Sequence, residues 1–218
     1  MTYILHLETA TKACSVALSL NGEQVALSEV NTAEYSHAEN LTVFVQNVLT
    51  EAQISLTDLA AVSVSSGPGS YTGLRIGVST AKGFCYALSI PLIAVDALYS
   101  LAQQALLRHP GKNLCAMIDA RRMEVFSAIY TGPLQLIKPI SADIIDETSY
   151  SEFGSFVYFG DGAEKLKNCW EQRDMQADLT IFSSAIGQIK EAYRKFTVQE
   201  FEDVAYFEPF YLKDFVSK

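Results

Sequence analysis

Two distant stretches of the sequence follow one pattern. Residues 5–18 read LHLETATKACSVAL, and residues 115–129 read CAMIDARRMEVFSAI. Each has an alternating strand pattern that ends in an acidic residue, then a polar turn, then a second alternating run. We interpret the likeness as a weak internal duplication. A duplicated supersecondary unit predicts two similar lobes, each built around a sheet.

The first half of the chain predicts the element order βββαβαβα. Asn21-Gly22 is a strong hairpin signal between alternating runs, and Ser36 with Glu39 forms a capping box at a helix start. After that helix, apolar runs of strand length alternate with helix patterns. The expected strands are residues 2–8, 14–20, 23–30, 59–66 and 91–95, and the expected helices begin near His37, after the glycine stretch at 67–73, and at 96.

The second half starts again in the same way. Strands are expected at 114–120, 125–131 and 134–140, followed by a strand, a glycine turn and a helix within 155–170, a helix over about 183–196, and an aromatic tail with PFYLK at 209–213. Two βββαβα-type lobes with mixed sheets describe an α/β protein with the duplicated actin-like (ASKHA, RNase H-like) fold. The first predicted lobe, residues 1–110, contains the helices that we expect to bind a partner. The second, residues 111–218, is smaller, and its C-terminal tail could pack back on the first lobe.

Charge and composition exclude several classes of function. The net charge is −9 and the first half is poor in charge, so the chain has no basic stripe for binding RNA or DNA tightly by itself. No apolar stretch reaches the roughly 20 residues that a membrane helix needs, and no export signal is visible. The scattered cysteines and histidines have no metal-ligand spacing, so we expect no metal and no cofactor. These cysteines and histidines are Cys14, Cys85, Cys115, Cys169, His6, His37 and His109.

The stretch SSGPGSYTGLRIGVSTAKGF at residues 65–84 looks like a phosphate-binding loop but fails each test. It is one residue too long for the dinucleotide fingerprint, no lysine follows as in a P-loop, and Pro68 stands where a nucleophile elbow needs glycine. Gly73, Gly77 and Ala81 instead make a smooth helical stripe. We predict a partner interface on this helix and the helix 37–52, with burial of both helices inside the chain as the alternative. The interface residues are His37, Leu41, Val45, Val48, Gly73, Leu74, Gly77, Val78 and Ala81.

The turns that hold phosphate in actin-like ATPases need glycine, because only a residue without Cβ lets backbone N–H groups close around a phosphate. ETATKACS and DARRMEV contain none. Glu8 and Asp119 at the strand ends could hold magnesium through water, but we favour a role as anchors of the turn hydrogen bonds. The sequence therefore predicts a protein without catalytic residues.

ILHLETATKACSVALSLNG, SHAENL, GPGSYTGLRIGVSTAKG, PLIAVDAL, MIDARRMEVFSAIY, FGDGA and PFYLK together resemble the bacterial TsaB (YeaZ) family, whose members are also labelled glycoprotease-like. The resemblance spans essentially the whole chain. It places the family's motif turns at Glu8, Gly67, Gly69, Ser70, Thr72, Arg75, Asp119 and Arg121, with Glu8 where the family commonly has aspartate.

The resemblance implies a cytoplasmic, non-catalytic scaffold that supports tRNA threonylcarbamoyladenosine synthesis. Its implied partners are the catalytic paralogue TsaD and the ATPase TsaE, with a homodimer when TsaD is absent and tRNA contacted only through the complex. Ala97 and Leu101 align with the histidine pair that binds the metal in TsaD, and neither can ligate a metal. The alternatives are a small-molecule kinase or ATPase of the ASKHA class and, less favoured, a peptidase.

Overall fold

The computed structural model describes residues 1–32 and 37–213 and contains two five-stranded mixed sheets. The first sheet has the order β3-β2-β1-β4-β5. An antiparallel meander of three strands pairs through β1 with the parallel strands β4 and β5. Its strands are β1 (Tyr3–Glu8), β2 (Cys14–Leu20), β3 (Glu23–Val30), β4 (Leu59–Gly67) and β5 (Leu92–Asp96).

The second sheet repeats this plan. Its order, β10-β9-β6-β7-β8, has an antiparallel meander of β6, β7 and β8 and parallel pairs β6·β9 and β9·β10. The strands are β6 (Leu114–Asp119), β7 (Glu124–Tyr130), β8 (Leu136–Ile144), β9 (Val157–Phe159) and β10 (Gln176–Asp178). The predicted duplication and the α/β fold with mixed sheets are therefore confirmed.

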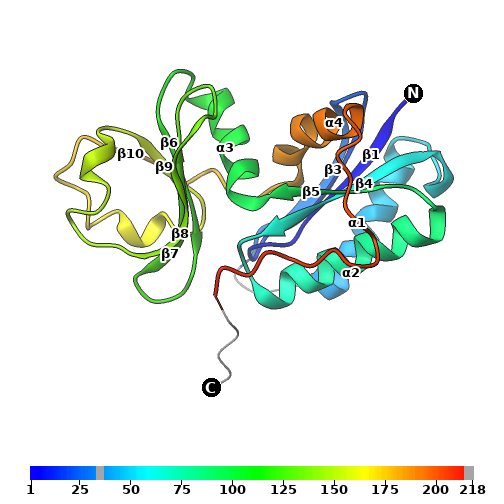
Figure 1. Ribbon diagram of the computed structural model, residues 1–218, viewed down its shortest axis with the longest axis horizontal. Helices are drawn as coiled ribbons and strands as arrows, with labels where there is room; N and C mark the ends of the chain where they lie inside the picture. Colours follow the sequence, from blue (N-terminus) through cyan, green and yellow to red (C-terminus); the bar gives the residue numbers. More distant parts are fainter. Residues whose placement is uncertain (33–36, 214–218) are drawn as a thin grey trace.

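Helices cover the two sheets unequally (Figure 1). Helices α1 (His37–Glu51) and α2 (Tyr71–Leu88) pack side by side on one face of the first sheet. Helix α4 (Ile189–Thr197) covers its opposite face, and α3 (Ala97–Arg108) packs on the second sheet. We call each sheet, with the helices on it, a lobe. Each lobe thus takes a helix from the other half of the sequence, and the proposed division near residue 110 stays a prediction.

Polar side chains cap two of these helices. Ser70 accepts a hydrogen bond from the Gly73 amide at the start of α2, and Asp96 accepts one from the Tyr99 amide at the start of α3. Both satisfy an amide that the helix itself leaves unpaired. The predicted capping serine of α1, Ser36, lies outside the described residues. Among these residues, no helix combines the length and apolar character required to cross a membrane.

The prediction of a helix within residues 155–170 is wrong. After β9 the chain makes only the short 3-10 turn η3 (Glu164–Leu166), and the other short turns are η1 (Leu56–Asp58), η2 (Ser151–Phe153) and η4 (Ala185–Gln188). Trp170 fills the space that a helix would cover, and its indole donates to the Asp146 carbonyl at 2.9 Å. It packs against the rings of Tyr150, Phe156 and Tyr158. These aromatic contacts replace helix packing on this face of the second sheet.

Candidate functional site

Glu8 ends β1 and is fully buried. Its Oε1 accepts from the Ala10 amide at 2.8 Å, and the Gln188 side-chain amide donates to Oε2 at 3.4 Å. Burial raises the pKa of Glu8 to about 7, against the opposing effect of these hydrogen bonds. The geometry agrees with the favoured prediction, because the carboxyl anchors the β1–β2 turn.

Asp119 occupies the equivalent position at the end of β6, but it is exposed. Its Oδ1 accepts from the Arg121 amide at 2.7 Å and pairs with the Lys165 ammonium at 2.6 Å. Arg121 has a left-handed backbone, φ 72°, and its side chain is exposed. Asp119 therefore anchors the β6–β7 turn, as Glu8 anchors the β1–β2 turn.

The glycine stretch packs against its own chain. A Cβ atom on Gly69 would overlap the carbonyl of Ala10, and one on Gly73 or Gly77 would overlap Thr9. The Ser70 amide donates to the Ala10 carbonyl at 2.6 Å. These glycines are thus required so that the start of α2 can approach the β1–β2 turn. The stretch is a seam between two backbone segments. This close packing explains why it is as rich in glycine as a phosphate-binding loop.

The nine residues predicted to form the partner interface lie in the interior. All are buried: His37, Leu41, Val45, Val48, Gly73, Leu74, Gly77, Val78 and Ala81. The His37 ring bonds to the Thr11 carbonyl at 2.8 Å, and the aliphatic residues face the sheets. The residue list is corrected accordingly, because these side chains hold α1 and α2 on their own sheet. Other residues of the two helices face outward. Among them, Val43 is 52% exposed and Tyr86 is 84% exposed.

Gly67 and Arg75 meet the C-terminal tail. The Phe210 amide donates to the Ser66 carbonyl at 2.7 Å. Gly67 has a positive φ of 104°, and a Cβ atom there would overlap the Phe210 carbonyl. The Arg75 guanidinium lies 4.0 Å from the centre of the Tyr71 ring and donates to the Tyr211 hydroxyl at 3.2 Å. The tail therefore packs back on the first lobe. Thr72 is exposed in the first turn of α2.

His6 and two serines form a buried chain that the sequence did not reveal. Nδ1 of His6 lies 2.7 Å from Ser63 Oγ and Nε2 lies 2.7 Å from Ser19 Oγ. Ser63 donates to Gln188 Oε1, so its oxygen accepts from Nδ1–H and Nε2 accepts from Ser19. Burial lowers the pKa of His6 to about 3. His6, Ser19 and Ser63 are all 0% exposed, so no substrate reaches this arrangement and it does not support a peptidase.

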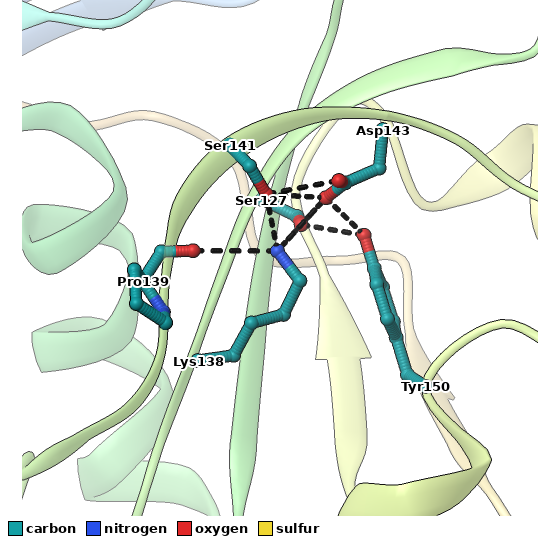
Figure 2. Close-up of polar contacts among 6 residues, drawn as sticks. All are labelled: Ser127, Lys138, Pro139, Ser141, Asp143 and Tyr150. Carbon is teal, nitrogen blue, oxygen red and sulfur yellow. Dashed lines mark hydrogen bonds and ion pairs between the residues drawn. The ribbon is translucent and has the colours of Figure 1, made fainter.

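A second polar network lies on β7 and β8 (Figure 2). The Lys138 ammonium is 2.6 Å from Ser141 Oγ, 3.0 Å from Ser127 Oγ and 2.8 Å from Asp143 Oδ2. Partial burial opposes ionisation of Asp143, but hydrogen bonds from Lys138, Tyr150 and the two serines outweigh it and lower the Asp143 pKa. Lys138 and Asp143 form an ion pair, and a lysine ammonium has no free lone pair with which to act as a base for either serine. The network ties β7 to β8.

The described residues contain no group of three or more His, Cys, Asp and Glu side chains that could hold a metal ion. Ala97 and Leu101, the two positions that the resemblance matched to a histidine pair, are buried in α3 against the second sheet. These two positions carry out a packing role in the second lobe.

Comparison with known proteins gives consistent results. Residues 29–214 match the family described as TsaD, tRNA N6-adenosine threonylcarbamoyltransferase. The tRNA threonylcarbamoyladenosine biosynthesis protein TsaB of Escherichia coli K12 is 41% identical over 58% of this chain and 54% of its own length. The Bacillus subtilis TsaB is 31% identical over 64% of this chain and 60% of its own length. The chain thus spans little more than half of these curated relatives.

Solved structures extend the likeness to the full fold. YeaZ from Pseudomonas aeruginosa has a TM-score of 0.81 at 26% identity, covering 97% of this chain and all of that one. The activator of the 2-hydroxyisocaproyl-CoA dehydratase from Clostridium difficile, with bound ADPNP, has a TM-score of 0.55 at 9% identity over 93% of this chain and 99% of its own, a likeness of fold alone.

The paired sheets and acid-anchored turns define an α/β protein of the duplicated actin-like class. Within that class, the chain belongs to the TsaD-type family and stands with its TsaB (YeaZ) members.

Proposed function

We propose that the chain takes part in tRNA threonylcarbamoyladenosine synthesis as a non-catalytic scaffold. It acts with TsaD and TsaE in transferring the threonylcarbamoyl group to the adenosine next to the anticodon, in tRNAs that read codons beginning with A. The names of its TsaB relatives support the pathway, and the proposal locates the chain in the cytoplasm with its tRNA substrate.

The observation that carries the non-catalytic role is the seam between the glycine stretch and the β1–β2 turn. In an actin-like ATPase this turn presents backbone amides to phosphate. Here the carbonyls of Thr9 and Ala10 point at α2 and its leading loop, and Glu8 holds the Ala10 amide. A turn whose backbone is engaged on its own chain is a structural element. Ala97 and Leu101, in place of metal-binding histidines, favour the same role.

The outward face of α1 and α2 is the surface we propose for TsaD. Val43 and Tyr86 are exposed apolar side chains, and Gly83 has open space beside it. Apolar groups exposed on adjacent helices suit docking against a second helix pair. The same face could pair two copies of the chain when TsaD is absent. With a net charge of −9, the chain reaches tRNA through the complex rather than alone.

Reconstitution with each component omitted tests the proposal. Purified TsaD and TsaE with tRNA, ATP and the threonylcarbamoyl donor should modify tRNA only when this chain is added. The chain alone should show neither steady ATP turnover nor stoichiometric zinc or iron, and only weak tRNA binding in a gel shift at physiological salt. ATP turnover that survives repurification favours the kinase or ATPase alternative, and unchanged modification without the chain refutes the scaffold role.

A further inference from the structure

A small cleft of about 320 Å³ lies where the lobes meet. The end of β5 and helix α4 contribute one wall, and β7, β8 and the turn between them contribute the other, with the start of α3 between. Its volume is at the lower end of the range for small-molecule sites. No residue discussed for the scaffold role lines it.

The walls of this cleft are largely apolar. The apolar residues that line it are Val95, Leu134, Leu136 and Ile140. Leu136 is 47% exposed, although the preceding strand, β7, is buried. An exposed leucine at the mouth of a concave site leaves apolar surface in water that a ligand would cover. The cleft therefore favours a compound with an apolar body.

Two polar groups in the cleft have unused capacity. Asp96 accepts from the Tyr99 amide at 2.8 Å, yet has no ion-pair partner in the described part of the chain. Tyr130 is 4% exposed, its ring lies 6.0 Å from that of Tyr99, and its hydroxyl has no hydrogen-bond partner among residues 1–32 and 37–213. A polar tip on a buried side chain that lines a cleft is suited to orient a ligand.

The other charged residues of the cleft are already paired. Glu191 binds the Arg194 guanidinium at 2.7 Å, and the Lys195 ammonium lies 2.9 Å from a carboxylate oxygen of Glu200. Lys195 attracts the Asp96 carboxylate at longer range, but among the described residues Asp96 has no ion-pair contact of its own.

We propose that this cleft binds a small organic amine, with its apolar body against Leu134, Leu136 and Ile140 and its ammonium group between Asp96 and Tyr130. An ammonium supplies the positive charge and the hydrogen-bond donors that a carboxylate and a phenol oxygen accept. A bound amine would contact both lobes at once and so stabilise their relative arrangement. This inference is independent of the scaffold role.

Titration with 2-phenylethylamine, followed by amide NMR shifts of the full chain, tests the proposal. Saturable shifts are expected around Asp96, Tyr130 and Leu136, with binding roughly tenfold tighter than that of the neutral isostere 2-phenylethanol. Equal affinity for the two compounds, or no saturable shift at millimolar concentration, overturns it.

Two conservative variants locate the ammonium. Asp96→Asn keeps a side chain able to cap α3 and should lose most of the preference for the amine over the alcohol. Tyr130→Phe removes only the hydroxyl and should weaken amine binding severalfold. Asp174→Asn, an exposed aspartate outside the cleft, is the matched control and should bind like the unmodified chain. If Asp96→Asn does not fold, Tyr130→Phe and the two-compound comparison still decide. Unchanged amine preference in Asp96→Asn, or unchanged amine affinity in Tyr130→Phe, contradicts the assignment.

Discussion

The two lobes share a strand order but close their sheets by different means. The first sheet is covered on one face by α1 and α2, held by a seam of small residues, and on the other by α4 (Figure 1). The corresponding connections of the second sheet are short turns, and a cluster of aromatic rings around Trp170 buries that face instead. The same sheet plan thus supports either long helices or compact turns with bulky side chains.

The difference determines which elements carry the exposed apolar side chains of each lobe. Two helices packed through glycine and alanine lie close to their sheet and leave an outward face with exposed Val43 and Tyr86. The aromatic cluster of the second lobe is buried in the interior, since Phe156 and Trp170 are each only 2% exposed. The apolar side chains that the second lobe does expose, Ile144 at 79% and Leu136 at 47%, lie on the strand β8 rather than on a helix.

The largest expected effect is on the second lobe. Trp170→Ala removes a buried ring together with its hydrogen bond to the Asp146 carbonyl. We expect a loss of about 3 to 5 kcal/mol in the free energy of unfolding, measured by circular dichroism during urea denaturation. A loss below about 1 kcal/mol would show that the aromatic cluster does not replace helix packing.

Buried Glu8 gives the stability of the first lobe a pH dependence. Its pKa is raised from 4.5 to about 7 in the folded chain, so the folded state binds more protons between these values. Its contribution is present at low pH, and stability falls by up to about 3 kcal/mol as pH rises from 4.5 through 7.

Urea denaturation at pH 5 and pH 8 measures this effect. Glu8→Gln keeps an oxygen for the Ala10 amide and should show a flatter profile of stability against pH than the unmodified chain. A Glu8→Gln profile parallel to that of the unmodified chain would contradict the assignment.

Gly77 is buried and Gly83 is exposed on a different face of α2, so the two positions separate folding from binding. Gly77→Leu would place a side chain against Thr9 and should cost about 1 to 3 kcal/mol of stability through overpacking. A Cβ atom on Gly83 would meet nothing within 4 Å, so in Gly83→Leu the melting temperature should hardly change while affinity for TsaD falls. Calorimetry of unfolding and of TsaD binding measures both. Normal TsaD affinity of Gly83→Leu would place the interface elsewhere.

Much of the fold followed from local patterns. The helix expected from residue 37 to 52 is observed as His37–Glu51, and the strand expected at 59–66 as Leu59–Gly67, because alternation and helical periodicity are strong in both. The helix expected within 155–170 fails for a tertiary reason. Leu166 and Trp170 both pack into the aromatic cluster. Short turns, not one straight helix, bring these two side chains to it.

The site was harder to predict for a general reason. A glycine stripe identifies a closely packed helix face, but both a sheet and a partner helix would cover it, and sequence alone does not distinguish them. The anchoring role of Glu8 was predictable, because its turn lacks glycine. The chain of Ser19, His6, Ser63 and Gln188 was not, because it joins three strands to a turn far along the sequence, and buried serines in strand runs are its only local sign.

The smallest expected effect concerns the tail, which contacts both lobes. Tyr211 meets Arg75 and Tyr71 on α2, and Lys213 pairs with Glu124 on β7. Tyr211→Ala should free the tail locally, so the Phe210 amide, bound to the Ser66 carbonyl, should exchange its hydrogen at least roughly tenfold faster, while the global free energy of unfolding changes by less than about 1 kcal/mol. Tyr206→Ala, at a side chain 84% exposed, is the control. If Phe210 exchange is unaffected, the backbone bond to Ser66 alone holds the tail. If global stability falls by several kcal/mol instead, the tail is part of the first lobe's core and the contrast between the lobes must be redrawn.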